Sequence, residues 1–115
     1  MLPDGGRVIN MSSLAALAGN RGQVNYAAAK GAINSATRAL SLEVASRGVT
    51  VNAIAPGIIQ SPMADAVFDA QAIAKLVPCQ RVGTPQEVAA LVAFLAGPEA
   101  GYITGQVVSI NGGVV

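Results

Sequence analysis

Residues 13–30 read SLAALAGNRGQVNYAAAK, and the rest of the chain is organised around this stretch. Tyr26 and Lys30 stand four positions apart in an alanine-rich run that favours a helix, so their side chains share one helical face. A free phenol has a pKa of about 10, and a cation held beside it favours the phenolate. Ser13 lies upstream, where its hydroxyl can hold a carbonyl oxygen for the phenol to protonate. Together the three groups indicate the reduction of a ketone or the oxidation of an alcohol.

Each of these residues also has an ordinary structural use, and that alternative stays open when each is considered alone. A tyrosine on an alanine-rich helix commonly packs against a neighbour, and a serine after a strand commonly forms a turn. The functional interpretation therefore depends on the pattern that the rest of the chain adds.

Charge is scarce in this chain of 115 residues. Only 11% of the residues are charged, against about 25% in a typical soluble domain, while 52% are hydrophobic. The length suits one domain, and a free domain this small should carry more charge. We therefore expect part of its surface to be covered by protein. The net charge of +1 gives no electrostatic reason to expect a nucleic acid or an anionic membrane as partner.

Several other classes of protein are disfavoured. No apolar run approaches the length of a membrane span, and the first residues do not resemble a secretion signal. Cys79 is the only cysteine, which is typical of a reducing compartment such as the cytoplasm, and it is expected to be a packing residue. The chain has no histidine, and the one carboxylate pair that could share a helix face, Asp65 and Asp69, is expected to be a solvated surface. No metal site is predicted.

The chain alternates strand and helix. Strands are predicted at 7–11 (RVINM), 50–55 (TVNAIA) and 106–110 (QVVSI), and helices at 24–46, 61–76 and 85–95. Thr84, Pro85 and Glu87 form a helix start, with a cap, a proline at the first helical position and a reciprocal glutamate. This order of elements predicts an α/β fold, in which about three parallel strands are joined by right-handed crossovers and flanked by helices.

The long helix at 24–46 has one apolar stripe, which we expect to face the core. Its members recur at helical spacing: Ala29, Ile33, Ala36, Leu40 and Val44. Gly48 marks the end of this helix. The segment 61–76 reads as one weaker helix, with Pro62 near its start and Pro78 after its end.

Chemistry-bearing residues follow all three predicted strands. Ser13 follows the first, Pro56 to Ile59 follow the second, and Asn111 and Gly112 follow the third. Ligands of such sheets bind outside the carboxyl ends of the strands, so we expect these residues to lie at one edge. Gly57 would let a flat ligand approach the backbone closely, where free N–H and C=O groups could bind a carboxamide. Taken alone, Pro56-Gly57 also fits an ordinary turn.

As a set, these motifs resemble the C-terminal half of the short-chain dehydrogenase/reductases, most closely the bacterial 3-oxoacyl-[acyl-carrier-protein] reductases. The matching segments are NMSS ending at Ser13, NYAAAK with Tyr26 and Lys30, VTVNAIAPG ending at Gly57, RVGTPQEVA, and YITGQVVSINGG. The resemblance spans essentially the whole chain at the family's spacings.

The resemblance implies a role for each matching residue. Tyr26 would protonate the carbonyl oxygen, Lys30 would favour the phenolate and hydrogen-bond the nicotinamide ribose, and Ser13 would hold the substrate oxygen. The residues implied to bind the cofactor, NADPH, are Tyr26, Lys30, Pro56, Gly57, Ile59 and, with a serine where the family usually has threonine, Ser61. The substrate would be an acyl-carrier-protein thioester of fatty-acid synthesis, and the protein a cytoplasmic homo-oligomer, a tetramer in the family.

The family's fold begins with a glycine-rich strand–turn–helix that binds the pyrophosphate, and no such motif opens this sequence. We therefore expect residues 1–115 to form the catalytic half of a partial Rossmann-like, doubly wound sheet, with the N-terminal dinucleotide-binding half absent or supplied as a separate partner. Two alternatives stay open. One is an inactive truncated fragment that serves only as a structural or oligomeric unit. The other is a related reductase of polyene, polyhydroxyalkanoate or sugar and alcohol metabolism, and the choice between NAD and NADP is also open.

Overall fold

Three parallel strands form the centre of the computed structural model, which describes residues 2–115. They are β1 (Arg7–Met11), β2 (Thr50–Pro56) and β3 (Val107–Ile110), in the spatial order β1-β2-β3. Arg7 lies opposite Thr50, and Ala53 lies opposite Val107. The three predicted strands are confirmed, although β2 runs one residue further and β3 begins one residue later than expected. Because β2 is covered on both faces and both edges, it is buried from Thr50 to Ala55.

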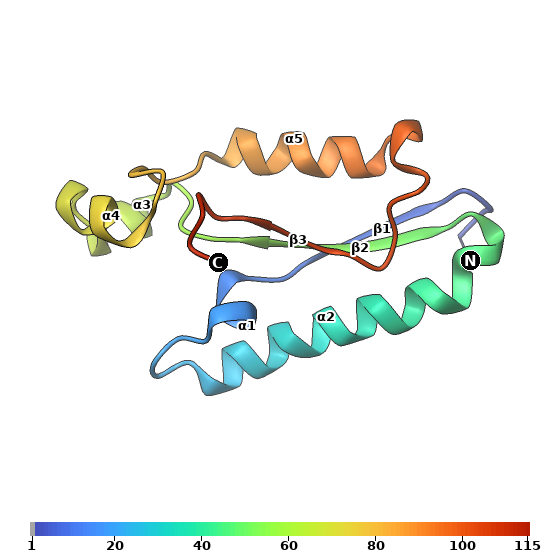
Figure 1. The fold of residues 1–115 in the computed structure, drawn as a ribbon, viewed down its shortest axis with the longest axis horizontal. Helices are drawn as coiled ribbons and strands as arrows, with labels where there is room; N and C mark the ends of the chain where they lie inside the picture. The colour runs from blue at the N-terminus through green and yellow to red at the C-terminus, as the bar shows by residue number, and fades with distance from the viewer. Residues whose placement is uncertain (1) are drawn as a thin grey trace.

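Helices cover both faces of this sheet, as predicted (Figure 1). The long helix α2 (Val24–Val44) and the short helix α1 (Leu14–Ala18) lie on one face, and α5 (Pro85–Ala96) lies on the other. The main core lies between α5 and the sheet. It is built on three buried residues, Ile54, Leu95 and Ala100, with Ile9, Leu91, Val92, Ile103, Val108 and Ile110 packed around them.

Helix α5 begins as its sequence predicts. The Thr84 hydroxyl accepts a hydrogen bond from the Glu87 N–H at 3.1 Å, and the Glu87 carboxylate accepts one from the Thr84 N–H at 3.0 Å. This reciprocal pair satisfies two backbone donors that would otherwise lack partners. The position at which α5 begins is therefore well defined, and so is the position of the residues just before it.

The predicted core stripe of α2 is wrong. The residues of this helix that are fully buried are Thr37 and Ser41, whereas Leu40 is 39% exposed and both Ala29 and Ala36 are exposed. The hydroxyls allow close approach, because Thr37 Oγ1 accepts from Asn10 Nδ2 at 3.0 Å and Ser41 Oγ donates to the Arg38 carbonyl at 2.7 Å. Thr37 thus bonds a residue of β1, Ser41 bonds its own helix, and α2 turns much of its predicted apolar stripe outward.

The end of α2 follows the prediction closely. The α-helix stops at Val44 and tightens into the 3₁₀ turn η1 (Ala45–Arg47). Gly48 follows with φ of +68°, the left-handed conformation that ends helices and that glycine adopts without strain.

The segment predicted as a single helix at 61–76 is two helices. They are α3 (Pro62–Val67) and α4 (Ala70–Leu76), separated by Phe68, whose backbone is extended. Asp69 caps the second helix, its carboxylate accepting from the Ala72 N–H at 2.8 Å. A capping aspartate competes with continuation of the helix, and this breaks the segment. Asp65 and Asp69 consequently share no helix face, and both are exposed as expected.

Three further findings concern predictions made from composition. Cys79 is exposed, so the expectation that it is a packing residue is wrong. Within residues 2–115, no three side chains of the metal-binding types gather into a cluster. No helix in the described part of the chain has the length and apolarity needed to cross a bilayer.

Candidate active site

A cavity of about 480 Å³ opens at the carboxyl ends of the strands. Four of the predicted site residues line it: Ser13, Tyr26, Pro56 and Gly57. They come from three separate parts of the chain, namely the start of α1, the first turn of α2 and the end of β2. The structure therefore brings together a hydroxyl, a phenol and a Pro-Gly turn, as the order of strands and helices led us to expect.

Ser13 is held by the start of α1. It is the N-cap of that helix, with an extended backbone, and its Oγ accepts a hydrogen bond from the Ala15 N–H at 3.2 Å. Because this bond uses a lone pair, the hydroxyl hydrogen can still be donated to an oxygen in the cavity. Ser13 therefore caps a helix and still has a hydroxyl hydrogen to donate at the wall of the cavity.

Lys30 lies one turn beyond Tyr26 on α2. Its Nζ is 5.8 Å from the centroid of the Tyr26 ring and donates a hydrogen bond to the Met11 carbonyl at 3.1 Å. The ammonium is thus anchored to the end of β1 and held beside the phenol, within the range of a cation–π contact. Lys30 itself does not line the cavity. The Tyr26 side chain is 45% exposed and therefore reachable by solvent.

Gly57 occupies a position that admits no side chain. A Cβ atom there would lie 2.7 Å from Asn111 Cβ and 3.0 Å from Asn111 Cα. The Gly57 N–H donates to the Ile110 carbonyl at 3.0 Å, which extends the pairing of β2 and β3 by one bond. Asn111 thus lies where the sequence predicted it, at the same edge, and it contacts the Pro-Gly turn closely.

Besides Lys30, two of the predicted cofactor-binding residues lie outside the lining of this cavity. Ile59 lines a neighbouring cavity of about 240 Å³, and Ser61 caps α3 by accepting from the Ala64 N–H at 3.0 Å. Ile58, which the sequence analysis did not single out, lines both cavities. Both isoleucines line the smaller cavity, and of the two only Ile58 also lines the larger one.

Sequence reasoning missed the apolar part of the cavity wall. It comprises Leu14 from α1, Phe68 from the break between α3 and α4, Leu76 at the end of α4, and Val114 near the C-terminus. Two polar residues, Asn20 and Gln23, also line it and are joined by a side-chain hydrogen bond of 2.7 Å. These residues meet only through long-range packing, and no local pattern could have identified them.

Comparisons with known proteins agree with this geometry. The family model described as "Enoyl-(Acyl carrier protein) reductase" matches residues 1–115. The fold and the match to this family model identify the class of the protein as an oxidoreductase. The chain belongs to the short-chain dehydrogenase/reductase family. The α/β, Rossmann-like sheet expected from the resemblance is confirmed.

The individual relatives have more specific descriptions than the family model. The chain is 52% identical over 111 residues to the 3-oxoacyl-[acyl-carrier-protein] reductase FabG of Vibrio cholerae serotype O1, covering 95% of this chain and 46% of the relative. It is 46% identical over 111 residues to nodulation protein G of Rhizobium sp. (strain N33), covering 95% and 45%. The chain therefore spans about half the length of the curated relatives it matches.

Two solved structures are closely similar. One is a short-chain dehydrogenase/reductase, titled glucose/ribitol dehydrogenase, from Brucella melitensis, with a TM-score of 0.91 and 37% identity over 99% of this chain and 47% of that one. The other is a blue fluorescent protein from a metagenomic library in complex with NADPH, with a TM-score of 0.91 and 38% identity over the same shares. The fold thus matches half of each neighbour almost completely.

Proposed function

We propose that this chain carries the Ser–Tyr–Lys site of an NADPH-dependent reductase that converts a 3-oxoacyl thioester, carried by acyl-carrier protein, to its 3-hydroxyacyl form in fatty-acid synthesis. The observation that carries this proposal is the cavity at which Ser13 and Tyr26 meet, with the Lys30 ammonium 5.8 Å from the Tyr26 ring. The relatives of about 50% identity that are named as 3-oxoacyl-[acyl-carrier-protein] reductases support the choice of substrate.

In this proposal the chain's own residues manage the oxygen and the proton. Ser13 donates its hydroxyl hydrogen to the substrate carbonyl oxygen and so fixes its position. Tyr26 transfers its phenolic proton to that oxygen as the carbonyl carbon is reduced, and the nearby Lys30 charge stabilises the phenolate left behind. Solvent then returns a proton to Tyr26, whose side chain is 45% exposed.

A nicotinamide cofactor fits one wall of this cavity. When bound, it supplies the hydride that reduces the carbonyl carbon. We propose that its nicotinamide end lies against the segment from Pro56 to Ile59, with Ser61 just beyond, and that Lys30 and Tyr26 contact its ribose. The narrow Pro-Gly turn leaves backbone rather than side chains facing the cavity at Gly57, and this suits a flat carboxamide-bearing ring. The similar structure that holds NADPH supports the same type of cofactor.

The phosphate end of the cofactor needs other residues. A pyrophosphate is ordinarily bound by a glycine-rich loop and a helix N-terminus. We propose that residues 1–115 are the catalytic half of the domain and that the phosphate-binding half lies outside them. The relatives, of which this chain covers about half, support this division.

The apolar wall of the cavity suits an acyl group. Leu14, Phe68, Leu76 and Val114 present hydrocarbon surface close to Ser13 and Tyr26. A substrate chain of several carbons would cover this surface, and its binding would gain about 25 cal/mol for each Å² of apolar surface removed from water. A sugar would instead require a dense set of hydrogen-bonding groups, and Asn20 and Gln23 already bond each other.

The test is a chimaera in which the N-terminal half of the Vibrio cholerae relative is joined to this chain at β1. NADPH absorbance decay with an acetoacetyl thioester should show turnover by the chimaera and none by the chain alone, because positioning of the cofactor needs both halves. Tyr26→Phe should lower the rate at least about 100-fold, since it removes the acid and keeps the ring. A folded chimaera that binds NADPH but reduces no thioester would contradict the proposal.

A second candidate function is a structural or oligomeric unit whose site is idle. The accessible surface of 7064 Å², against about 5,800 Å² for a compact protein of this mass, leaves area for another chain to cover, as both candidates require. The two candidates separate in the same assay. An inactive but folded chimaera would favour the structural unit. Formation of NADPH when the chimaera is given NADP+ with ribitol or glucose, without reduction of the thioester, would favour a polyol or sugar dehydrogenase.

A further inference from the structure

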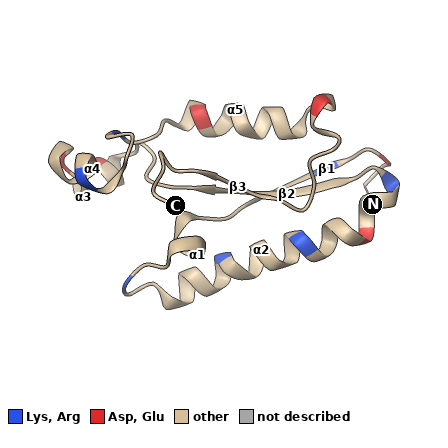
Figure 2. Cartoon of the chain, in the orientation of Figure 1, with Lys and Arg blue, Asp and Glu red and all other residues tan. Residues whose placement is uncertain are grey.

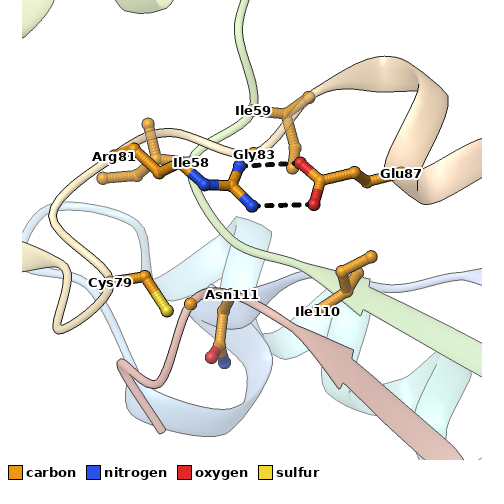
Figure 3. A pocket seen from close by; sticks show the side chains of 9 residues that line it. Ile58, Ile59, Cys79, Arg81, Gly83, Glu87, Ile110 and Asn111 are labelled. Atoms are coloured by element: carbon orange, nitrogen blue, oxygen red, sulfur yellow. Dashed lines mark hydrogen bonds and ion pairs between the residues drawn. The ribbon is translucent and has the colours of Figure 1, made fainter.

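We have assigned the Pro56–Ser61 segment to the cofactor. This segment also contacts a part of the chain that lies away from the active-site cavity. There it borders the cavity of about 240 Å³ shown in Figure 3, whose wall includes Ile58, Ile59, Arg81 and Glu87. Ile58 lines this cavity and the active-site cavity alike. A contact that holds Ile58 in the wall of the second cavity therefore also holds it in the wall of the active-site cavity.

A short parallel bridge joins the segment to Gly83. The Gly83 N–H donates to the Ile58 carbonyl at 2.9 Å, and the Gln60 N–H donates to the Gly83 carbonyl at 2.8 Å. The fit is close, because a Cβ atom at Gly83 would lie 2.9 Å from Ile59 Cδ1. Gly83 thus holds the middle of the segment at a defined position.

Gly83 is held in turn by its neighbours on both sides. Arg81 donates from Nη1 and Nη2 to the two Glu87 carboxylate oxygens, at 2.8 and 2.9 Å (Figure 3). Its Nη1 also donates to the Val82 carbonyl at 3.1 Å. Glu87 also accepts from the N–H and the hydroxyl of Thr84, at 3.0 and 3.3 Å. We call Arg81, Thr84 and Glu87 the Glu87 clamp, because it encloses the residues immediately before and after Gly83.

The charge of Glu87 is strongly favoured in this clamp. Hydrogen bonding from Arg81, followed by that from the Thr84 N–H, lowers the pKa of Glu87 to about 2. The same pairing raises the pKa of Arg81. At neutral pH both partners are fully charged, and the bidentate geometry gives the pair a fixed orientation.

The Pro56–Ser61 segment is therefore fixed at two places. Its beginning is joined to the end of β3, where the Gly57 N–H donates to the Ile110 carbonyl. Its middle is joined through Gly83 to the first turn of α5. Between these two places lies Ile58, the residue shared by both cavities.

We propose that Glu87 is a positioning residue for the cofactor: by closing the clamp around Gly83 it holds Ile58 and Gly57 where the nicotinamide end of the cofactor is received. The cofactor part of this inference rests on the proposed function, whereas the mechanical part concerns this chain alone. Glu87 does not line the active-site cavity. Its effect reaches the cofactor through Gly83 and the Ile58–Gln60 backbone.

The mechanical part is tested by amide hydrogen exchange on the chain. Two variants break the ion pair and keep the helix cap: Arg81→Met, and Glu87→Gln, whose side-chain carbonyl can still accept from Thr84. In both, the Gln60 and Gly83 amides should exchange about fivefold faster, as expected for loss of a partly exposed ion pair that stabilises a local structure.

Internal references separate the clamp from a general loss of stability. The Ala53 amide donates to the Gln106 carbonyl within the sheet, and the amide of residue 87 donates to the Thr84 hydroxyl in the helix cap. Both report general stability and should accelerate less than Gln60 and Gly83 do. Asp4→Asn removes a different ion pair, that of Asp4 with Arg47, and should leave the exchange rates of Gln60 and Gly83 unchanged. If Gln60 and Gly83 exchange at the wild-type rate in both clamp variants, the inference is overturned.

The cofactor part is tested in the chimaera. Glu87→Gln should raise the NADPH KM about fivefold and change kcat less than about twofold, because the segment is displaced while Ser13, Tyr26 and Lys30 are kept. Faster exchange with an unchanged KM would overturn the positioning role. A wild-type chimaera without activity would count against the proposed function, and the exchange rates would then decide on the clamp by themselves.

Discussion

Gln80 has a left-handed backbone conformation, with φ of +61°, in the turn between α4 and α5. A side chain with a Cβ costs about 1 kcal/mol in that conformation, and a β-branched side chain costs more. The residue is exposed, so its side chain gains little from packing in return. The turn therefore stores a small strain between Cys79 and Arg81, which both line the cavity of about 240 Å³.

Substitution of Gln80 should reveal this strain. Gln80→Gly relieves the backbone but adds freedom to the unfolded chain, so we expect a net gain of about 0.5 kcal/mol in the free energy of unfolding. Gln80→Val should lower it by about 1 kcal/mol, because the branched side chain is disfavoured at positive φ. Urea denaturation of the two variants measures the difference, and equal midpoints would contradict the prediction.

Gly57 offers a second test, with Gly31 as its matched control. Gly57→Ala should lower the free energy of unfolding by about 1–3 kcal/mol, because the new methyl group would overlap Asn111. Gly31 lies inside α2 with no atom within 4 Å of a Cβ position, so Gly31→Ala should raise the same quantity by about 0.5–1 kcal/mol. Thermal or urea unfolding would show opposite signs for the two substitutions, and a shared sign would contradict the steric argument.

The candidate site could be predicted in part from such residues. Ser13, Tyr26, Pro56 and Gly57 converge because the carboxyl ends of parallel strands share an edge, a property of the topology that short motifs reveal. The positions of Phe68 and Val114 could not be predicted, since they depend on where α3, α4 and the C-terminus pack. The directions of Ile58 and Ile59 also depend on the bridge to Gly83, which no sequence pattern announces.

At the scale of the element, the start of α5 shows how local chemistry determines a boundary. Thr84, Pro85 and Glu87 are sufficient to begin the helix, and the predicted cap is the observed one. The segment at 61–76 shows the converse. Its apolar content suggested one helix, but the caps at Ser61 and Asp69 favour two short ones. The buried face of α2 was unpredictable for another reason, because small hydroxyl-bearing side chains, rather than the available apolar stripe, lie closest to the sheet.

The α5 start should make stability depend on acid pH. The folded pKa of Glu87, about 2, is below its ordinary value of 4.5, so ionised Glu87 stabilises the fold above pH 4.5. That contribution is lost progressively as the pH falls from 4.5 toward 2. The difference in free energy of unfolding between the wild type and Glu87→Gln should therefore be largest near neutral pH and shrink through this window, as measured by urea titration at pH 7, 4 and 3. A difference that is constant with pH would contradict the pairing.

At the scale of the whole molecule, the chain is elongated, with extents of 48 × 29 × 21 Å and a radius of gyration of 15.4 Å. A compact domain of similar length has a radius of about 13 Å. The present chain also carries little charge on its outer surfaces. In α5, no residue from Val88 to Ala96 is charged (Figure 2). Both findings agree with the expectation, made from composition, that protein covers part of this surface.

We expect the isolated chain to self-associate. Leu42 on α2 is 65% exposed and Phe94 on α5 is 47% exposed, and exposed apolar groups on helix faces of low charge favour association. Sedimentation at micromolar concentration should show a dimer or larger species. Leu42→Lys and Phe94→Lys should shift the distribution toward monomer, whereas Gln86→Lys, at an exposed polar position of α5, should not. A soluble wild-type monomer at that concentration would refute the prediction.

The parallel sheet has a consequence for the time course of folding. Both strand pairs join residues that are far apart in the sequence. Arg7 pairs with Thr50 on the other side of α2, and Ala53 pairs with Val107 after three intervening α-helices. Every sheet contact must therefore close a long loop before it gains any pairing energy, and such topologies fold slowly. We expect α2, the longest local structure, to form before the strands pair, and until β2 is enclosed its apolar side chains are open to other chains. The helix that carries Tyr26 and Lys30 should thus also influence how fast the chain folds and how well it escapes aggregation.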